Sequence, residues 1–171
     1  MDIVDCILAD HNRQRTLFAA LDEARDDPQA LGRIFNHLKN FLEAHAEAEE
    51  RFFYPTLLKK GDGALDSDSA AETTEDAIED HNKIAEAAEE ALKHAPGSDE
   101  WWAAVDKCNC ANSEHMSEEE RQGLTDFRRS VPRDQRVRLA IQYLAFESKH
   151  AGEYRRTEKD PDAYIEKHET A

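Results

Sequence analysis

Two histidine–glutamate pairs stand at matching places in the two halves of the chain. His45 is followed four residues later by Glu49, and 70 residues further on His115 is followed by Glu119. In a helix, residues four apart lie one above the other on the same face, so each pair aims an imidazole and a carboxylate at a common point. One such pair arises by chance in acidic helical proteins, but its repetition indicates side chains that coordinate a metal.

The repeat extends beyond these pairs. Asp10-His11-Asn12 in the first half matches Asp80-His81-Asn82 in the second, again 70 residues apart. In both halves, the histidine of this triplet precedes the histidine of the following pair by 34 residues. The chain therefore holds two copies of one unit, which together nominate six side chains of metal-ligand type. These are His11, His45, Glu49, His81, His115 and Glu119.

Helices are expected to carry these residues, because helix formers dominate and glycine, proline and β-branched residues are scarce. Apolar residues at three-to-four-residue spacing predict five helices. These cover about residues 2–25, 28–54, 70–94, 98–129 and 134–156. Pro28 suits the first turn of the second helix and Ser98 can cap the fourth. Tyr54-Pro55 disturbs the end of the second helix, since the residue before proline leaves the α region.

The depths of the histidines along their helices predict a single cluster. At 1.5 Å per residue, His11 lies about 22 Å before the end of the first helix, and His45 about 25 Å after the start of the second. The same calculation gives about 20 and 25 Å for His81 and His115. An up-down-up-down bundle therefore brings all four histidines and both glutamates to one level, pointing inward.

We therefore predict an all-α fold, an up-down-up-down four-helix bundle of two repeated helix pairs, plus a C-terminal fifth helix. The bundle is expected over residues 1–130, and the fifth helix packs on it within residues 131–158. Residues 159–171 are polar and are expected to form a loose tail. A chain of 171 residues suits one domain with a sizeable core.

The net charge of −16 argues against nucleic acid or an anionic membrane surface as partner. The acidic N-terminus has only a short, broken apolar run, so we expect no signal peptide, and no apolar stretch approaches a membrane span. Cys6, Cys108 and Cys110 form an odd set without a disulfide pattern. Together these features predict a protein of the reducing cytoplasm.

Six ionisable side chains on the apolar faces of helices are costly unless they pair or coordinate a cation. Four imidazoles and two carboxylates are too many for one tetrahedral zinc. They suit two ions, each held by two histidines, with the carboxylates bridging, and mixed nitrogen and oxygen ligands favour non-haem iron. Ferritin-like bundles use the order Glu-x-x-His, which differs from the His-x-x-x-Glu order found here.

The complete pattern of DHN, HAEAEERFFYP, DHN and HMSEEER resembles the hemerythrin-like, or HHE cation-binding, proteins over about residues 1–130. The resemblance implies a four-helix bundle that holds two non-haem iron ions with an oxo or hydroxo bridge and reacts with dioxygen, nitric oxide or peroxide. It further implies that the four repeated histidines are terminal ligands and that Glu49 and Glu119 are bridges.

The chain differs from the oxygen-carrying hemerythrins around His81. Those proteins have a second histidine four residues from the first on the third helix, where this chain has Ala77 and Ala85. Each iron would then keep an open or water-filled position, which favours redox chemistry on small oxidants over oxygen carriage. Four other histidines could in principle supply a fifth ligand, but they lie off the ligand face, at a helix end, in the tail or outside the repeat. These are His37, His94, His150 and His168.

The role of Tyr54 stays open at this level. Continuing the helix would place it about 140° around from Glu49, away from the cluster. The break before Pro55 could swing the phenol back toward the metals, as an extra ligand or a radical-quenching neighbour. The alternative is an aromatic packed beside Phe52 and Phe53. Glu50 and Glu120 are expected to be solvated or to support the ligands, paired with Arg51 and Arg121.

Three functions are compatible with this pattern. The favoured one is an enzyme that decomposes peroxide or detoxifies nitric oxide and peroxide, with an electron donor that the sequence does not identify. The alternative is a module that binds or senses oxygen, nitric oxide or iron without turnover. The third is a metal-free bundle in which the histidines form a buried polar network. The sequence names no catalytic residue beyond the metal centre. It does not distinguish iron from manganese, and it does not give the oligomeric state.

Overall fold

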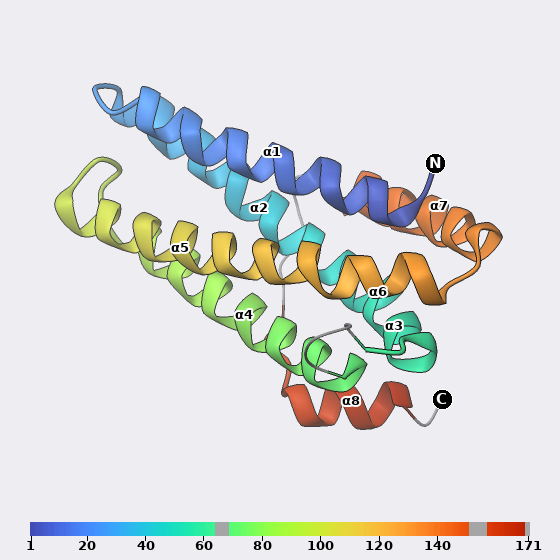
Figure 1. The fold of residues 1–171 in the computed structure, drawn as a ribbon. Helices are drawn as coiled ribbons and strands as arrows, with labels where there is room; N and C mark the ends of the chain where they lie inside the picture. Colours follow the sequence, from blue (N-terminus) through green and yellow to red (C-terminus); the bar gives the residue numbers. More distant parts are fainter. Residues whose placement is uncertain (64–68, 151–156, 170–171) are drawn as a thin grey trace.

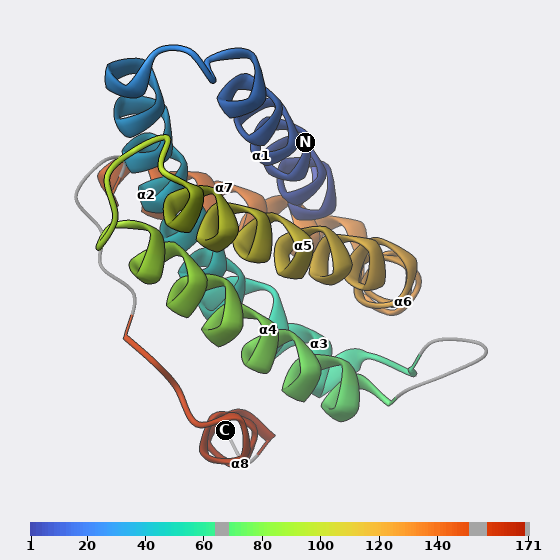
Figure 2. The same cartoon turned by 90° about the vertical axis from the view of Figure 1, so that its left-hand side faces the viewer.

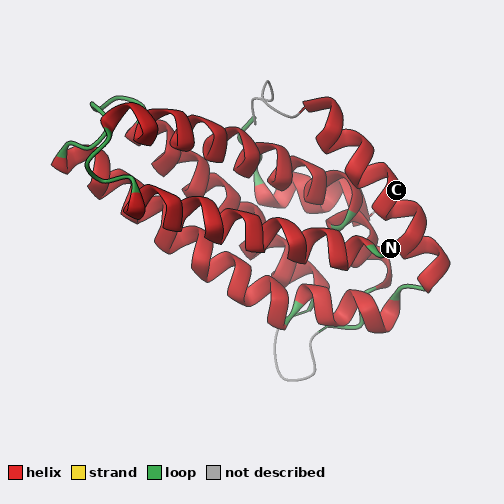
Figure 3. Ribbon diagram, turned by 90° about the horizontal axis from the view of Figure 1, so that it is seen from above, coloured by secondary structure: helices red, strands yellow, loops and turns green. Residues whose placement is uncertain are grey.

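A computed structural model describes residues 1–63, 69–150 and 157–169, and over these ranges the chain is helical with no strand (Figure 3). Eight helices lie in the described part of the chain. They are α1 (Ile3–Glu23), α2 (Pro28–Phe52), α3 (Tyr54–Lys60), α4 (Ala70–Ala91), α5 (Asp99–Arg121), α6 (Gly123–Ser130), α7 (Arg133–His150) and α8 (Pro161–Glu169).

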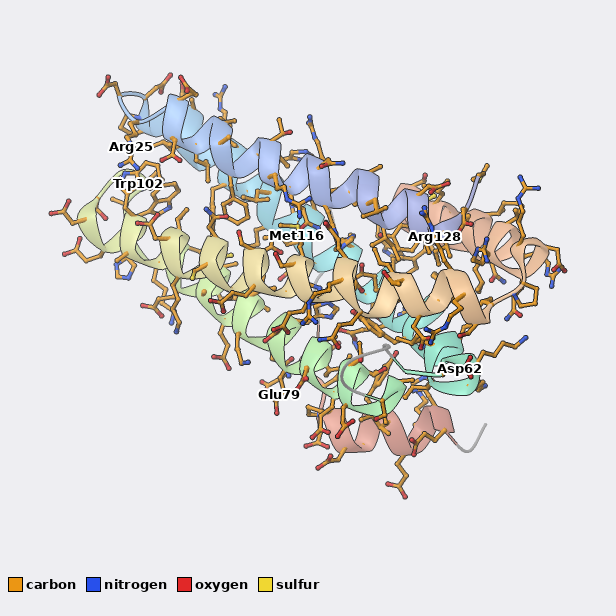
Figure 4. All side chains as sticks on the ribbon, in the orientation of Figure 1. Arg25, Asp62, Glu79, Trp102, Met116 and Arg128 are labelled. Atoms are coloured by element: carbon orange, nitrogen blue, oxygen red, sulfur yellow. The ribbon has the colours of Figure 1, made fainter. Side chains whose placement is uncertain are left out.

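Four long helices, α1, α2, α4 and α5, run up and down and form the bundle (Figure 1). Figures 1 and 2 show α1 beside α2 and α4 beside α5, so each sequence repeat forms one helix pair. At the end of the bundle where both pairs turn, the Arg25 guanidinium lies 4.1 Å from the centre of the Trp102 ring and joins the two pairs (Figure 4). The predicted all-α bundle of two helix pairs is confirmed.

Side-chain caps set where the helices start, and hence the depth of the residues they carry. Asp27 Oδ1 accepts hydrogen bonds from Gln29 N and Ala30 N, each at 3.0 Å, directly before Pro28. Ser98 Oγ accepts from Trp101 N at 3.1 Å at the start of α5. Both starts agree with the prediction. A side chain that caps the backbone N–H groups of the first turn is a strong start signal, and proline at the first helical position strengthens it.

The helices α2 and α5, which carry the two His-x-x-x-Glu motifs, both break just after the motif. The first break falls at Phe53, before the predicted Tyr54-Pro55 disturbance. The second falls at Gln122, so the single helix predicted to run to residue 129 is wrong and is split into α5 and α6. Gly123 weakens the helix at this point, and beyond the break Phe127 packs against Phe53 at a centroid distance of 4.7 Å.

Two apolar cores lie on either side of the level of the repeated histidines. One core fills the end of the bundle at the turns, where Phe35 and Trp101 pack edge to face at 5.4 Å. The other fills the end with the helix breaks and includes Phe53, Phe127 and Tyr143. The polar residues between them are therefore enclosed by apolar packing along the bundle axis.

The C-terminal part of the chain packs on the bundle through two helices. α7 lies against α1 and α2 and corresponds to the predicted fifth helix, whose last residues, 151–156, lie outside the described part. The loose tail expected at 159–171 is wrong for residues 161–169, which form α8 against α3 and α4. Asp160 Oδ1 accepts from Ala163 N at 2.8 Å before Pro161, and Tyr164 is buried, so a cap and one aromatic anchor hold this short helix.

None of the described helices combines the length and the apolar character that crossing a membrane requires.

Candidate metal centre

The six side chains nominated by the repeat converge from four helices, and none is more than 3% exposed. α1 supplies His11, α2 supplies His45 and Glu49, α4 supplies His81, and α5 supplies His115 and Glu119. We refer to these six residues as the histidine–glutamate cluster. The six side chains lie at one level of the bundle and point inward, as the helix geometry predicted.

Glu49 lies at the centre of the cluster. Its Oε1 atom is 3.0 Å from Nε2 of His45 and 3.9 Å from Nε2 of His11, and its Oε2 atom is 3.3 Å from Nε2 of His81. Two groups of side chains with metal-ligand atoms close together share this carboxylate. One is His11, His45 and Glu49, and the other is Glu49, His81 and His115.

The remaining contacts close the cluster from α5. Oε2 of Glu119 lies 3.2 Å from Nε2 of His11, and the Nε2 atoms of His81 and His115 are 3.2 Å apart. The six residues therefore offer nitrogen and oxygen atoms to a common interior space from both helix pairs.

Several of these inward-facing atoms have no hydrogen bond although they are buried. They are Nε2 of His11, Nε2 of His45, both carboxylate oxygens of Glu49 and Oε2 of Glu119. A buried polar group without a partner costs about 1–3 kcal/mol, so a cluster of five such atoms is unfavourable unless something binds them together. Cations satisfy nitrogen and oxygen atoms of this kind, so the donor set fits metal ions.

Three of the four histidines are oriented through their outward Nδ1 atoms. Nδ1 of His11 lies 2.9 Å from Oε1 of Glu120, and Nδ1 of His81 lies 2.9 Å from Oε1 of Glu50. Nδ1 of His45 lies 2.8 Å from the hydroxyl of Tyr143. With the proton on Nδ1 donated to these oxygens, each Nε2 lone pair faces the interior, the arrangement seen in metal-bound histidines.

Glu50 and Glu120 therefore support the cluster, as the sequence allowed, and Glu50 is buried instead of solvated. Their cationic partners differ from the expected neighbours in sequence. Lys159 Nζ lies 2.6 Å from Oε2 of Glu50, and Arg15 lies 2.7 Å from Oε1 of Glu120. Both cations come from other helices or segments, which local spacing cannot reveal.

Tyr143 was missed as a site residue. It is fully buried on α7, and its hydroxyl donates to Oδ2 of Asp10 at 2.7 Å while it contacts His45. Asp10, His45 and Glu147 form a further group of ligand-type side chains beside this contact. Burial and the charge of Asp10 raise the pKa of Glu147 to about 8. Tyr143 does lie on the apolar stripe of the predicted fifth helix, but the placement of that helix was not known.

Tyr54 reaches the cluster and packs as an aromatic at the same time. Its hydroxyl donates to Oε1 of Glu119 at 2.5 Å, and its ring lies 4.9 Å from that of Phe53. Burial and the charge of Glu119 raise the pKa of Tyr54 well above its usual range, so the phenol keeps its proton. The break at Phe53 turns this side chain inward, which was one of the two outcomes left open.

Protonation differs across the cluster. Burial, followed by repulsion from His81, lowers the pKa of His115 well below its usual range, so this imidazole is neutral and able to bind a cation. Burial also lowers the pKa of His45, but the contacts with Glu49 and Asp10 together outweigh it and raise the pKa well above the usual range. Without a cation, a proton on His45 therefore neutralises part of the charge of Glu49.

The other histidines lie away from the cluster. His37 stacks on Phe41, His94 pairs with Glu90, and His168 Nδ1 lies 2.7 Å from the carbonyl oxygen of Tyr164. The ring of His150 packs on Phe146 at 4.4 Å. Over the ranges that the structure describes, none of these four histidines belongs to a group of converging ligand atoms.

Comparisons with known proteins agree with this geometry. A family model described as the hemerythrin HHE cation binding domain matches residues 2–124, which is most of the chain. A protein named "DNA nickase" from Nostoc sp. (strain PCC 7120 / SAG 25.82 / UTEX 2576) is 27% identical over 150 residues, covering 87% of this chain. The aligned part spans only 40% of that relative's length. No solved structure matches the chain. The chain belongs to the hemerythrin HHE cation-binding domain family.

Proposed function

We propose that the protein binds two non-haem iron ions in the histidine–glutamate cluster and decomposes small oxidants, either peroxide alone or nitric oxide together with peroxide. The observation that carries the proposal is the set of five buried nitrogen and oxygen atoms around Glu49 that make no hydrogen bond. A mixed set of imidazoles and carboxylates is typical of non-haem iron.

In this proposal His11 and His45 hold one ion and His81 and His115 hold the other. Glu49 would be a ligand available to both ions, since it is the carboxylate shared by both groups of ligand atoms. Glu119, beside His11, provides the second carboxylate. Bound iron would supply the electrons that small oxidants accept.

The surrounding residues hold protons at fixed atoms. The phenol of Tyr54 keeps a proton next to Glu119, and the Nδ1 protons of three histidines are held by Glu120, Glu50 and Tyr143. These contacts would fix the ligand atoms and place one proton donor beside the centre. Alanine stands four residues before and four residues after His81, so no imidazole from these positions competes with an incoming oxidant, which favours turnover over oxygen carriage.

Elemental analysis and absorption spectroscopy of the purified protein test this proposal directly. We expect about two irons per chain, with loss of the metal and the colour in His45→Ala and His115→Ala, and turnover of hydrogen peroxide by the unaltered protein. Reversible binding of nitric oxide without any turnover would favour the sensing alternative. A metal-free protein, or one with a single zinc, would overturn the assignment.

The name of the Nostoc relative raises DNA as a second candidate ligand, which we consider disfavoured for this chain. The net charge of −16 opposes approach to phosphates. The densest run of arginines lies around the turn from α6 to α7, where Arg128, Arg129, Arg136 and Arg138 each form an ion pair with an aspartate. We expect no gel shift and no nicking of supercoiled plasmid at low salt. Nicking that disappears in His45→Ala would establish the DNA-directed function instead.

A further inference from the structure

Two small cavities lie on opposite sides of His81, each beside one of the alanines four residues away from it. The first is lined by Ala85 and lies between α2, α4 and α5. The second is lined by Ala77 and lies between α3, α4 and α5. Each has a volume of about 20 Å³. A space of this size holds about one water-sized molecule, so neither can take an organic substrate.

The two cavities differ in chemistry. The first has an apolar wall that includes Leu42, Ala46 and Ile84, and it ends at the imidazoles of His45, His81 and His115. Its polar lining residues are Lys39, Glu43 and Asn112. The second is lined by acidic side chains, including Asp76, Asp80 and Glu118, and it ends at Tyr54, His115 and Glu119. Apolar walls favour small uncharged molecules, because these lose little hydration on entry, whereas the carboxylates of the second cavity favour water and cations.

We propose that the cavity beside Ala85 is the binding pocket through which a small, weakly hydrated oxidant, dioxygen or nitric oxide, reaches the cluster. This inference rests on the proposed function for the identity of the oxidant. It rests on the structure for the route, since one wall of the first cavity is apolar and three cluster histidines line its inner end.

The small side chain at position 85 accounts for the space. Ala85 is half-buried on α4, one turn beyond His81, so a longer side chain here would extend into the cavity and not only into solvent. Position 85 is also one of the two places, four residues from His81, where alanine stands instead of a second histidine. A histidine side chain here would occupy part of the space that the cavity now leaves.

An ion-pair network connects two of the helices that line the cavity. Lys39, which lines the cavity from α2, lies 2.7 Å from Glu43 on the same helix and 2.7 Å from Glu89 on α4. The side chain of Lys39 is only 9% exposed, whereas that of Glu89 is 59% exposed, so this link between α2 and α4 is partly solvated.

Stopped-flow binding of nitric oxide to the reduced, iron-loaded full chain tests the route. Ala85→Leu should fill the cavity and lower the association rate at least about tenfold, with the iron content and helical circular dichroism unchanged. Ala85→Ser is the matched control, because it keeps the cavity open and should bind at nearly the original rate. An unchanged rate in Ala85→Leu would overturn the proposal, as would equal slowing in both variants.

Crystals of the full chain under krypton pressure give a readout that needs neither iron nor turnover. Krypton should occupy the cavity between Leu42, Ala46 and Ile84 in the unaltered protein and should be absent in Ala85→Leu. Krypton found only in the cavity beside Ala77, or in neither, would overturn the pocket even if the protein consumes peroxide. If krypton occupies the expected cavity but the purified protein contains no iron, the pocket would be supported and the proposed function would be contradicted.

Discussion

Glu49 and Glu119 occupy equivalent places in the two repeats but have different surroundings. Both oxygens of Glu49 are buried without a hydrogen bond, whereas Oε1 of Glu119 accepts the phenol proton of Tyr54. The residue 70 positions after Tyr54 is Leu124, which has no polar atom to offer. One carboxylate is therefore tuned by a hydrogen bond and the other is not, so the two halves of the candidate centre are chemically unequal despite the repeat.

Removing the hydroxyl of Tyr143 should weaken metal binding. In Tyr143→Phe, Nδ1 of His45 loses its partner at 2.8 Å, and the imidazole is no longer held in the tautomer that turns Nε2 inward. We expect a loss of about 10–100-fold in metal affinity, measured by competition with a chelator, with the helical circular dichroism unchanged.

Tyr164→Phe is the matched control for this change. Tyr164 is also a buried tyrosine of the C-terminal segment, but its hydroxyl donates to the backbone carbonyl of Glu50 and not to a histidine of the cluster. The metal affinity of Tyr164→Phe should stay within about threefold of the original. Equal losses in the two variants would mean that Tyr143 acts through general packing and not through the orientation of His45.

At the scale of elements, helical spacing predicted the four long helices and their starts, because each start has a local signal. Asp27-Pro28 and Ser98 act on backbone groups within three residues, so the sequence alone identifies them. The same signal at Asp160-Pro161 marks α8. It was overlooked because the segment is polar and its stability depends on burying Tyr164 against the bundle.

Contacts between distant elements could not be predicted in this way. The repeat placed six side chains at one level, which needed only helix geometry and an up-down topology. Tyr143 orients His45 from a segment with no fixed spacing to the histidines. The same holds for Lys159 and Arg15, which pair with the supporting Glu50 and Glu120. The break at Gln122 was likewise missed, since Gly123 is a weak signal until the packing of Phe127 on Phe53 is known.

At the scale of the whole molecule, the bundle consists of two apolar cores separated by a polar layer. The cores at the turn end and at the break end each pack well, but the histidine–glutamate cluster between them buries five atoms without hydrogen bonds. The free energy of unfolding should therefore depend on whether a ligand occupies the histidine–glutamate cluster. A ligand that binds only the folded state adds about 2.7 kcal/mol when present at 100 times its dissociation constant.

Removal of the metal should therefore lower the melting temperature of the whole chain. For a protein of this size, a loss of that magnitude corresponds to a decrease of about 5–10 °C in Tm. Calorimetry before and after chelation under reducing conditions measures it, with the double variant His45→Ala/His115→Ala as control, because a protein without the site should not respond to the chelator. The pKa of His45 is raised in the metal-free state, so chelation should also take up a proton near neutral pH, and reloading should release it. An identical Tm with and without metal would mean that the two apolar cores alone stabilise the bundle and that the cluster contributes nothing to folding.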